Sequence, residues 1–200
     1  MALNWAVSQR NESDVVLCFH KRMVDLAGVR KTVCSLDSVN QIVECLKQEQ
    51  PDVVIHTAGL TSVQECEKNP ELAEYANVTI TKNVATACAA EGIRYVHIST
   101  DHLFDGTQSL LTEDAPHSPI NVYGLTKAKA EEAVHAQNEQ ALIIRTNFYG
   151  WGTNYRYSFS DFVIDALRTK NPIQLFDDIF YSPILADRLV RITHDLVDKE

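Results

Sequence analysis

Glycine and proline are scarce in this chain, with seven and six among its 200 residues. These low numbers exclude collagen-like and low-complexity sequences, in which the two residues dominate. Hydrophobic residues make up 45% of the chain and charged residues 22%, which is the composition of an ordinary globular protein. Because domains usually contain roughly 100–200 residues, we expect one main domain with at most a small additional region.

Closely spaced cysteine pairs are missing. The five cysteines, Cys18, Cys34, Cys45, Cys66 and Cys88, include no C-x-x-C motif. An odd number without close pairs argues against a disulfide framework and against a structural zinc site. We therefore expect reduced thiols in a cytoplasm and no bound metal.

Long hydrophobic runs and a basic charge excess are missing as well. The apolar stretch at residues 1–7 is too short for a signal peptide or a membrane span. The formal net charge of -9 argues against a broad basic surface for nucleic acid or anionic lipid, although a local basic pocket for a phosphate remains compatible with it. We expect a cytoplasmic protein whose partners include neither nucleic acid nor a membrane.

Short apolar segments alternate with amphipathic ones along most of the chain. Apolar runs of the kind found in strands buried on both faces predict strands at 14–19, 31–34, 53–57, 94–98 and 141–145. Apolar residues at helical spacing predict helices at 1–11, 38–49, 70–91, 121–136, 158–169 and 184–197. This alternation predicts an α/β fold with a doubly wound parallel sheet covered by helices on both faces.

Polar side chains follow the strand expected at 94–98, at the sheet edge where doubly wound folds bind ligands. Ser99 and Thr100 come directly after this strand, and Tyr123 and Lys127 share one face of the next helix. An ammonium group beside a phenol favours the phenolate and lowers the phenol pKa from about 10. Such a tyrosine could protonate a carbonyl during its reduction, with a hydroxyl of Ser99 or Thr100 holding the developing alkoxide and a cofactor supplying hydride. A tyrosine and a lysine at this spacing also occur by chance on helix surfaces, so the strand before them carries much of the argument.

Four segments make the interpretation more specific: residues 51–59 (PDVVIHTAG), 97–106 (HISTDHLFDG), 121–127 (NVYGLTK) and 145–150 (RTNFYG). In this order they resemble the extended short-chain dehydrogenases/reductases, and among these most of all the dTDP-4-dehydrorhamnose reductase family. The resemblance implies a Rossmann-like fold. Residues 1–145 would form an NAD(P)-binding domain, and residues 146–200 a partial substrate-binding region packed on it.

The same resemblance implies roles for individual residues. The implied catalytic set is Thr100, Tyr123 and Lys127, with Ser99 as the alternative hydroxyl. The implied cofactor-binding residues are Tyr123, Lys127, Thr57, Ala58, Gly59, His20, Lys21 and Arg22. The implied contacts to a nucleotide-sugar substrate are Asn147 and Trp151.

The cofactor preference rests on residues 20–22. His20, Lys21 and Arg22 follow the strand expected at 14–19, where an NAD-preferring protein usually has an acidic residue. Basic side chains there favour NADP, whose 2′-phosphate attracts a cation, with NAD as the alternative. Residues 20–22 could instead form a solvated loop without a role in binding. Residues 57–59 could instead form only a tight turn after the strand.

One part of the family pattern is missing. A complete Rossmann reductase begins with a hydrophobic strand and a Gly-rich turn that holds the pyrophosphate, and none of the seven glycines forms such a turn. Members of the family also continue beyond the segment that here occupies residues 181–185. We therefore expect a fragment that lacks the first strand of the sheet and part of the substrate region, with flanking strands that lose one partner.

Three functions are compatible with these features. NAD(P)H-dependent reduction of a keto group on a nucleotide-activated sugar is favoured by Thr100, Tyr123 and Lys127. A non-catalytic regulatory or binding subunit is favoured by the missing Gly-rich turn, since a relative of this family is the regulatory subunit of methionine adenosyltransferase. An epimerase or dehydratase of nucleotide sugars would use the same Tyr/Lys pair, and a homodimer is compatible with each function.

Overall fold

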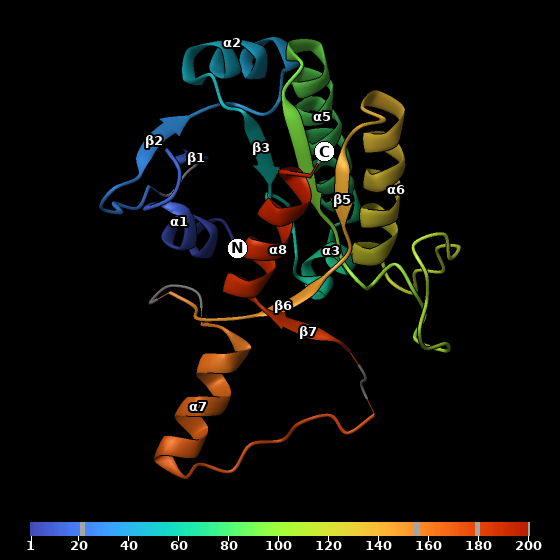
Figure 1. Cartoon of the computed structure of the whole chain (residues 1–200). Coiled ribbons are helices and arrows are strands. Elements are labelled where there is room, and N and C mark those ends of the chain that lie inside the picture. The colour runs from blue at the N-terminus through green and yellow to red at the C-terminus, as the bar shows by residue number, and fades with distance from the viewer. Residues whose placement is uncertain (21–22, 154–156, 179–180, 200) are drawn as a thin grey trace. The chain divides into compact units, whose positions relative to one another are not determined.

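The chain divides into two compact units in a computed structural model that describes residues 1–20, 23–153, 157–178 and 181–199. The strand–helix unit consists of Cys18–Asp25 and Lys31–Arg145. The terminal unit consists of Met1–Leu17, Leu26–Arg30 and Thr146–Glu200. Figure 1 labels the helices and strands of both units.

Three parallel strands form the sheet of the strand–helix unit. In spatial order they are β3 (Val53–His56), β4 (Arg94–Ile98) and β5 (Leu142–Ile144). His97 of β4 is paired with His56 on one side and with Ile143 on the other. Because the strands are parallel, their carboxyl ends lie at one edge of the sheet. The segments that begin at Thr57 and Ser99 leave the sheet at this edge.

One central helix packs on this sheet. The helix α5 (Ile80–Glu91) lies against β3 and β4, and both α2 (Val39–Glu49) and α6 (Val122–Gln137) pack on α5 (Figure 1). Small side chains on α5 allow these close contacts, since Ala85, Ala87 and Cys88 are completely buried. The main hydrophobic cluster consists of Cys34, Ile42, Leu46, Val84, Ala85, Ala87, Cys88, Tyr95 and Val134.

The helix expected at 70–91 is interrupted. It consists of α4 (Pro70–Glu74), a π-helical turn η1 (Tyr75–Thr79) and α5. Its ends agree with the prediction, because Pro70 occupies the first turn and Gly92 ends α5 with a φ of 66°. A π-turn accommodates an extra residue within a helix and is frequent at functional sites. Another short helix, α3 (Val63–Lys68), precedes α4 and was not expected.

The terminal unit contains three helices and two strands among its described residues: α1 (Ala2–Gln9), β6 (Asn147–Tyr149), α7 (Phe159–Thr169), β7 (Pro183–Leu185) and α8 (Ala186–Val197). The strands β6 and β7, which were not expected, form a parallel pair. The helices α1 and α8 are joined by a hydrogen bond of 3.0 Å from Trp5 Nε1 to His194 Nε2. A second bond of 2.7 Å runs from Ser8 Oγ to Asp187 Oδ1.

The α/β fold with parallel sheets is confirmed, but the sheet is not continuous. The strands β1 (Val16–Phe19) and β2 (Arg30–Val33) pair with each other, and no described strand joins β1 to β3. The expectation of strands that lack one partner therefore holds for the described residues. The burial expected on both faces of the first strand is wrong, because Cys18 is exposed. A strand paired on one side only leaves part of its surface uncovered.

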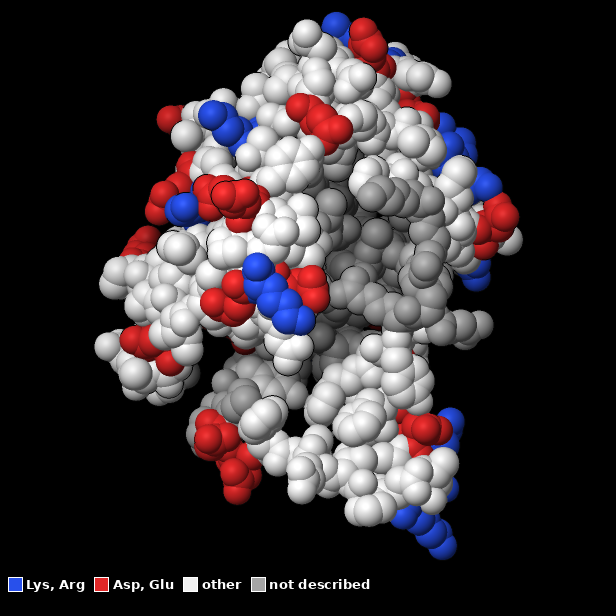
Figure 2. All heavy atoms as spheres, turned by 180° about the vertical axis from the view of Figure 1, so that it is seen from behind, with Lys and Arg blue, Asp and Glu red and all other residues white. Residues whose placement is uncertain are grey.

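The described surface is mixed in charge. Figure 2 shows Lys and Arg side chains interspersed with Asp and Glu side chains on one face of the molecule. The absence of a nucleic-acid partner stays a prediction from the net charge. Each helix in the described ranges is too short or too polar to cross a membrane.

Candidate active site

The carboxyl end of β4 supplies two buried hydroxyl groups. Ser99 N donates a hydrogen bond of 2.7 Å to Ile144 O, which continues the pairing of β4 with β5 by one residue. Ser99 is 5% exposed and Thr100 is 4% exposed. The backbone N–H of His102 donates to Thr100 Oγ1 at 3.2 Å and fixes the turn that follows.

The first turns of α6 lie directly against this turn. The helix begins at Asn121, whose Oδ1 accepts a hydrogen bond of 2.8 Å from Gly124 N. A Cβ atom on Gly124 would lie only 2.2 Å from the carbonyl oxygen of His102. Glycine at this position therefore lets the segment after β4 approach α6, and the approach brings Thr100 to Tyr123.

Tyr123 is partly buried beside the turn that follows β4. Its ring meets the ring of His102 edge-on, at 5.3 Å between centroids. Burial raises the pKa of Tyr123, and a hydrogen bond with the Thr100 side chain acts in the opposite direction. The expectation that Lys127 lowers the pKa of Tyr123 is wrong for this arrangement, because burial outweighs the opposing effects and Lys127 is bonded elsewhere.

Lys127 lies inside the strand–helix unit with only 6% of its surface exposed. Its Nζ atom is 2.9 Å from His97 Nε2 and donates to Ile98 O at 2.8 Å. Burial lowers the pKa of Lys127 from 10.5 to about 8, while the nearby Glu131 carboxylate acts to raise it. The ammonium group thus titrates close to physiological pH.

The segment Thr57–Ala58–Gly59 follows β3 at the same edge of the sheet. A Cβ atom on Gly59 would lie 2.8 Å from Asn77 Oδ1, so the absence of a side chain lets this segment approach η1 closely. The Asn77 side chain also forms two hydrogen bonds with the backbone of Leu60, the residue after Gly59. Leu60 N donates to Asn77 Oδ1 at 2.7 Å, and Asn77 Nδ2 donates to Leu60 O at 3.1 Å.

Asn77 also contacts α6. Its Nδ2 donates to Thr126 Oγ1 at 2.9 Å, and that hydroxyl donates to Tyr123 O at 2.9 Å. Asn77 therefore joins the segment after β3 to α6. The role of Asn77 was not predicted from the sequence. Its position four residues from both Ala73 and Thr81, on the buried face of the helix, could have indicated a polar residue that needs a hydrogen-bond partner.

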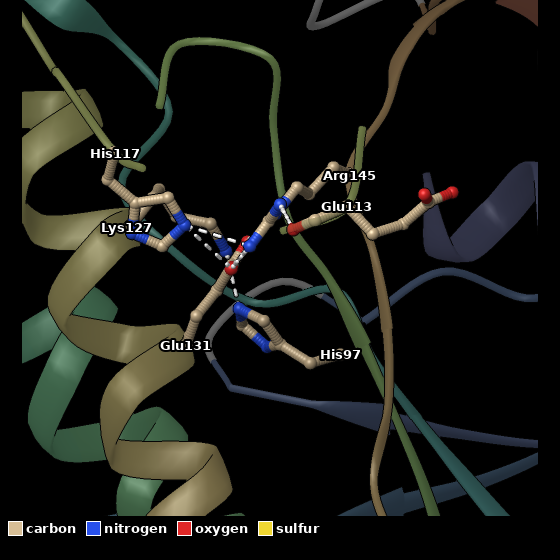
Figure 3. A network of polar contacts seen from close by, with 6 residues as sticks. All are labelled: His97, Glu113, His117, Lys127, Glu131 and Arg145. Carbon is tan, nitrogen blue, oxygen red and sulfur yellow. Dashed lines mark hydrogen bonds and ion pairs between the residues drawn. The ribbon is translucent and has the colours of Figure 1, made fainter. Parts of the chain in front are cut away.

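A second group of buried charges secures the segment between β4 and α6 (Figure 3). Glu131 is 2% exposed on its side chain and forms an ion pair of 2.8 Å with Arg145 Nη2. Arg145 also donates to Glu113 O at 2.7 Å, and its Nη2 lies 2.8 Å from His117 Nε2. The guanidinium group thus ties the residues around 113–117 to α6 and to the end of β5.

The described contacts do not bring every other expected site residue to Thr100, Tyr123 and Lys127. His20 is exposed just after β1, and Lys21 and Arg22 lie outside the described residues. Asn147 and Trp151 belong to the terminal unit, where Asn147 opens β6 and Trp151 is 65% exposed. Within the described ranges, no group of His, Cys, Asp or Glu side chains is arranged to hold a metal ion.

The parallel α/β fold, with Thr100, Tyr123 and Lys127 beyond the end of β4, defines the class of the extended short-chain dehydrogenases/reductases. Within this class, the chain belongs to the family described as the RmlD substrate binding domain, whose model matches residues 12–200.

Several curated proteins are similar to this chain. The "Probable low-salt glycan biosynthesis reductase Agl14" of Haloferax volcanii is 34% identical over 82% of this chain and 56% of its own length. The dTDP-4-dehydrorhamnose reductase of Salmonella typhimurium is 31% identical over 76% of this chain and 50% of its own length. The methionine adenosyltransferase 2 subunit beta of Xenopus laevis is 38% identical over 48% of this chain and 29% of its own length.

Solved structures agree with the family. A hypothetical dTDP-4-dehydrorhamnose reductase from Sulfolobus tokodaii has a TM-score of 0.83 at 26% identity, covering 98% of this chain and 68% of that one. The dTDP-4-dehydrorhamnose reductase of Bacillus anthracis, solved in complex with NADP, has a TM-score of 0.76 at 26% identity, covering 88% of this chain and 64% of that one. The chain spans about half the length of the curated relatives it matches.

Proposed function

We propose that this chain carries the catalytic residues of an NAD(P)H-dependent oxidoreductase that reduces a keto group on a nucleotide-activated sugar. The observation that carries the proposal is the arrangement at the carboxyl end of β4, where Thr100 and Lys127 are buried and the Thr100 side chain is hydrogen-bonded to Tyr123. Relatives named dTDP-4-dehydrorhamnose reductase support the choice of a keto nucleotide sugar as substrate.

The phenol of Tyr123 is suited to donate a proton. Because its pKa is raised by burial, it keeps its proton at neutral pH until a stronger base forms beside it. The alkoxide of a reduced sugar ketone is such a base and takes the phenolic proton. The ammonium group of Lys127 then stabilises the phenolate, and the Thr100 hydroxyl can bond the same sugar oxygen.

A nicotinamide cofactor supplies the hydride when it is bound, and the residues fit its ribose end. Lys127 uses two of its three N–H groups within the described chain, which leaves one for a ribose hydroxyl. The segment 57–59 offers backbone groups at the same sheet edge. The sequence contains no Gly-rich turn for the pyrophosphate. We therefore assign Lys127 and residues 57–59 to the ribose and the nicotinamide alone.

We propose NADP as the preferred cofactor and NAD as the alternative. The basic residues at 20–22 support NADP, as does the Bacillus anthracis relative that was solved with NADP. On the substrate side, we propose that Asn147 and Trp151 contact the nucleotide sugar. The division into a cofactor domain at 1–145 and a substrate region at 146–200, the cytoplasmic location and a homodimer belong to the same proposal.

An NADPH oxidation assay with dTDP-4-dehydrorhamnose tests this function. We expect turnover by the chain and a loss of at least about 100-fold in kcat for Tyr123→Phe, because the ring is kept and the proton donor is removed. Tyr75→Phe is the matched control and should retain activity, since Tyr75 binds Asp37 away from the catalytic set. Absence of turnover in the wild type, or equal activity of Tyr123→Phe, contradicts the proposal.

A second candidate is a non-catalytic regulatory subunit. It is favoured by the similarity to methionine adenosyltransferase 2 subunit beta. Calorimetry with NADPH separates the two candidates, because a regulatory role without cofactor predicts no heat of binding. Stable association with a methionine adenosyltransferase catalytic subunit in size-exclusion chromatography, without reductase turnover, would favour this candidate.

A further inference from the structure

The catalytic lysine contacts a histidine that no function described so far uses. His97 lies on β4 with none of its surface exposed, and its Nε2 atom is 2.9 Å from Lys127 Nζ. Figure 3 shows both residues, one reaching from α6 and the other from β4. Together with Ile98 O, His97 occupies two of the three N–H groups of the lysine.

The imidazole of His97 is in the neutral form that can accept a hydrogen bond. Burial keeps the pKa of His97 well below its ordinary value, and the charges of Lys127 and His56 act in the same direction. His56 faces the same place from β3, and burial lowers its pKa to about 3. Glu131, on α6 itself, is the acidic group beside Lys127. Lys127 therefore faces two neutral rings and one carboxylate.

A packing role is the competing explanation for His97. Its ring packs against the ring of His56, at 5.8 Å and 22°, and against the ring of Tyr95, at 6.5 Å and 18°. An apolar ring would stack as well without burying a polar atom, yet the Nδ1 atom of His97 is buried with no hydrogen-bond partner among the described residues. Burying an unpaired polar atom is unfavourable. The contact of Nε2 with Lys127 supplies a reason to keep a histidine at this position.

We propose that His97 is a positioning residue, whose Nε2 atom holds the Lys127 ammonium group so that one N–H remains for the ligand. The inference rests on the proposed function for its role in catalysis. The hydrogen bond itself is a property of the chain. Because the bond favours the charged form of the lysine, its loss should shift the titration of Lys127 to lower pH.

Two substitutions separate hydrogen bonding from packing. His97→Gln keeps an acceptor and loses the ring, whereas His97→Phe keeps the ring and loses the acceptor. His97→Leu removes both the ring and the acceptor. Its smaller side chain makes it the alternative variant if phenylalanine does not fit. Titration of the Lys127 Cε resonance in 13C-lysine-labelled protein without cofactor gives the readout, with the signal assigned by its loss in Lys127→Arg.

We expect the wild type to titrate at about 8. We expect His97→Gln to stay close to it and His97→Phe and His97→Leu to titrate lower by about one pH unit. An unshifted titration in the Phe and Leu variants, or an equal shift in the Gln variant, overturns the inference. Because the titration uses neither cofactor nor substrate, its outcome is independent of whether the chain is a reductase.

Discussion

At the scale of single residues, the proposed reduction depends on Lys127, which is buried and still able to carry a positive charge. The described partners of Lys127 are a neutral imidazole, a carbonyl oxygen and a nearby carboxylate, none of which repels an ammonium group. Burial disfavours the charged form, and these partners limit that effect. Lys127 can therefore hold a positive charge at neutral pH and release a proton a little above it.

The lowered pKa of Lys127 predicts a pH dependence of stability. Between pH 8 and 10.5 the unfolded chain binds more protons at Lys127 than the folded chain, so the folding stability contributed by this group rises with pH. Relative to Lys127→Met, the free energy of unfolding of the wild type should increase by on the order of 3 kcal/mol across this window. Urea unfolding at both pH limits measures it.

The control is Lys129→Met on the same helix, since Lys129 is partly exposed and pairs with Glu74. Its stability difference from the wild type should stay nearly constant between the two pH values. A constant difference for Lys127→Met as well would show that Lys127 titrates normally.

The sequence predicted the residues of the candidate site better than their environment. Tyr123 and Lys127 could be named because they share a helix face. Thr100 was preferred to Ser99 only through the family resemblance, since both hydroxyls follow the strand. Asn77 and His97 could not be assigned, because their partners Thr126 and Lys127 are distant in sequence. The pKa direction of Tyr123 was wrong because burial is a property of the whole unit, which residue spacing does not contain.

At the scale of elements, the site depends on contact between the segment after β4 and the first turn of α6. The sequence predicted both elements but not what holds them together. Gly124 permits their close approach, and Arg145 ties residues 113–117 to Glu131. The helix expected at 70–91 shows the same limit. Its ends follow from Pro70 and Gly92, whereas the π-turn at Asn77 depends on tertiary contacts.

Gly124→Ala should damage the site through this contact. The added methyl group would lie 2.2 Å from a backbone oxygen, so the segment that carries Thr100 must move. Overpacking of this kind costs roughly 1–3 kcal/mol, which lowers the melting temperature by about 2–10 °C, and kcat should fall because Thr100 is displaced. Leu125→Ala is the control at the neighbouring exposed position. Wild-type melting temperature and kcat in Gly124→Ala would refute the role of this contact.

Arg145→Met should destabilise the strand–helix unit. It leaves Glu131, 2% exposed, without its guanidinium partner, and loss of one member of a buried pair costs about 3 kcal/mol. The double variant Arg145→Met/Glu131→Leu should recover part of this loss, because it removes the buried carboxylate that Arg145→Met leaves without its guanidinium partner. The exposed pair of Arg191 with Asp187 provides the control, and Arg191→Met should cost less than about 1 kcal/mol. Equal urea midpoints for Arg145→Met and Arg191→Met would contradict the prediction.

At the scale of the whole molecule, the residues expected at the site are distributed over two compact units. Thr100, Tyr123 and Lys127 all lie in the strand–helix unit, and the two expected substrate contacts lie in the terminal unit. The alternation of strands and helices predicted the α/β fold. The strands β6 and β7 were missed because three-residue strands show no clear periodicity.

Transfer of deuterium is the most direct test of the central claim, that these residues support reduction of a sugar ketone by a nicotinamide cofactor. The chain is incubated with dTDP-4-dehydrorhamnose and NADPH carrying deuterium at the transferable position, and the product is examined by NMR and mass spectrometry. We predict one deuterium on the carbon that carried the ketone, and strongly reduced transfer by Tyr123→Phe. A product without deuterium, or substrate recovered unchanged, would contradict the account.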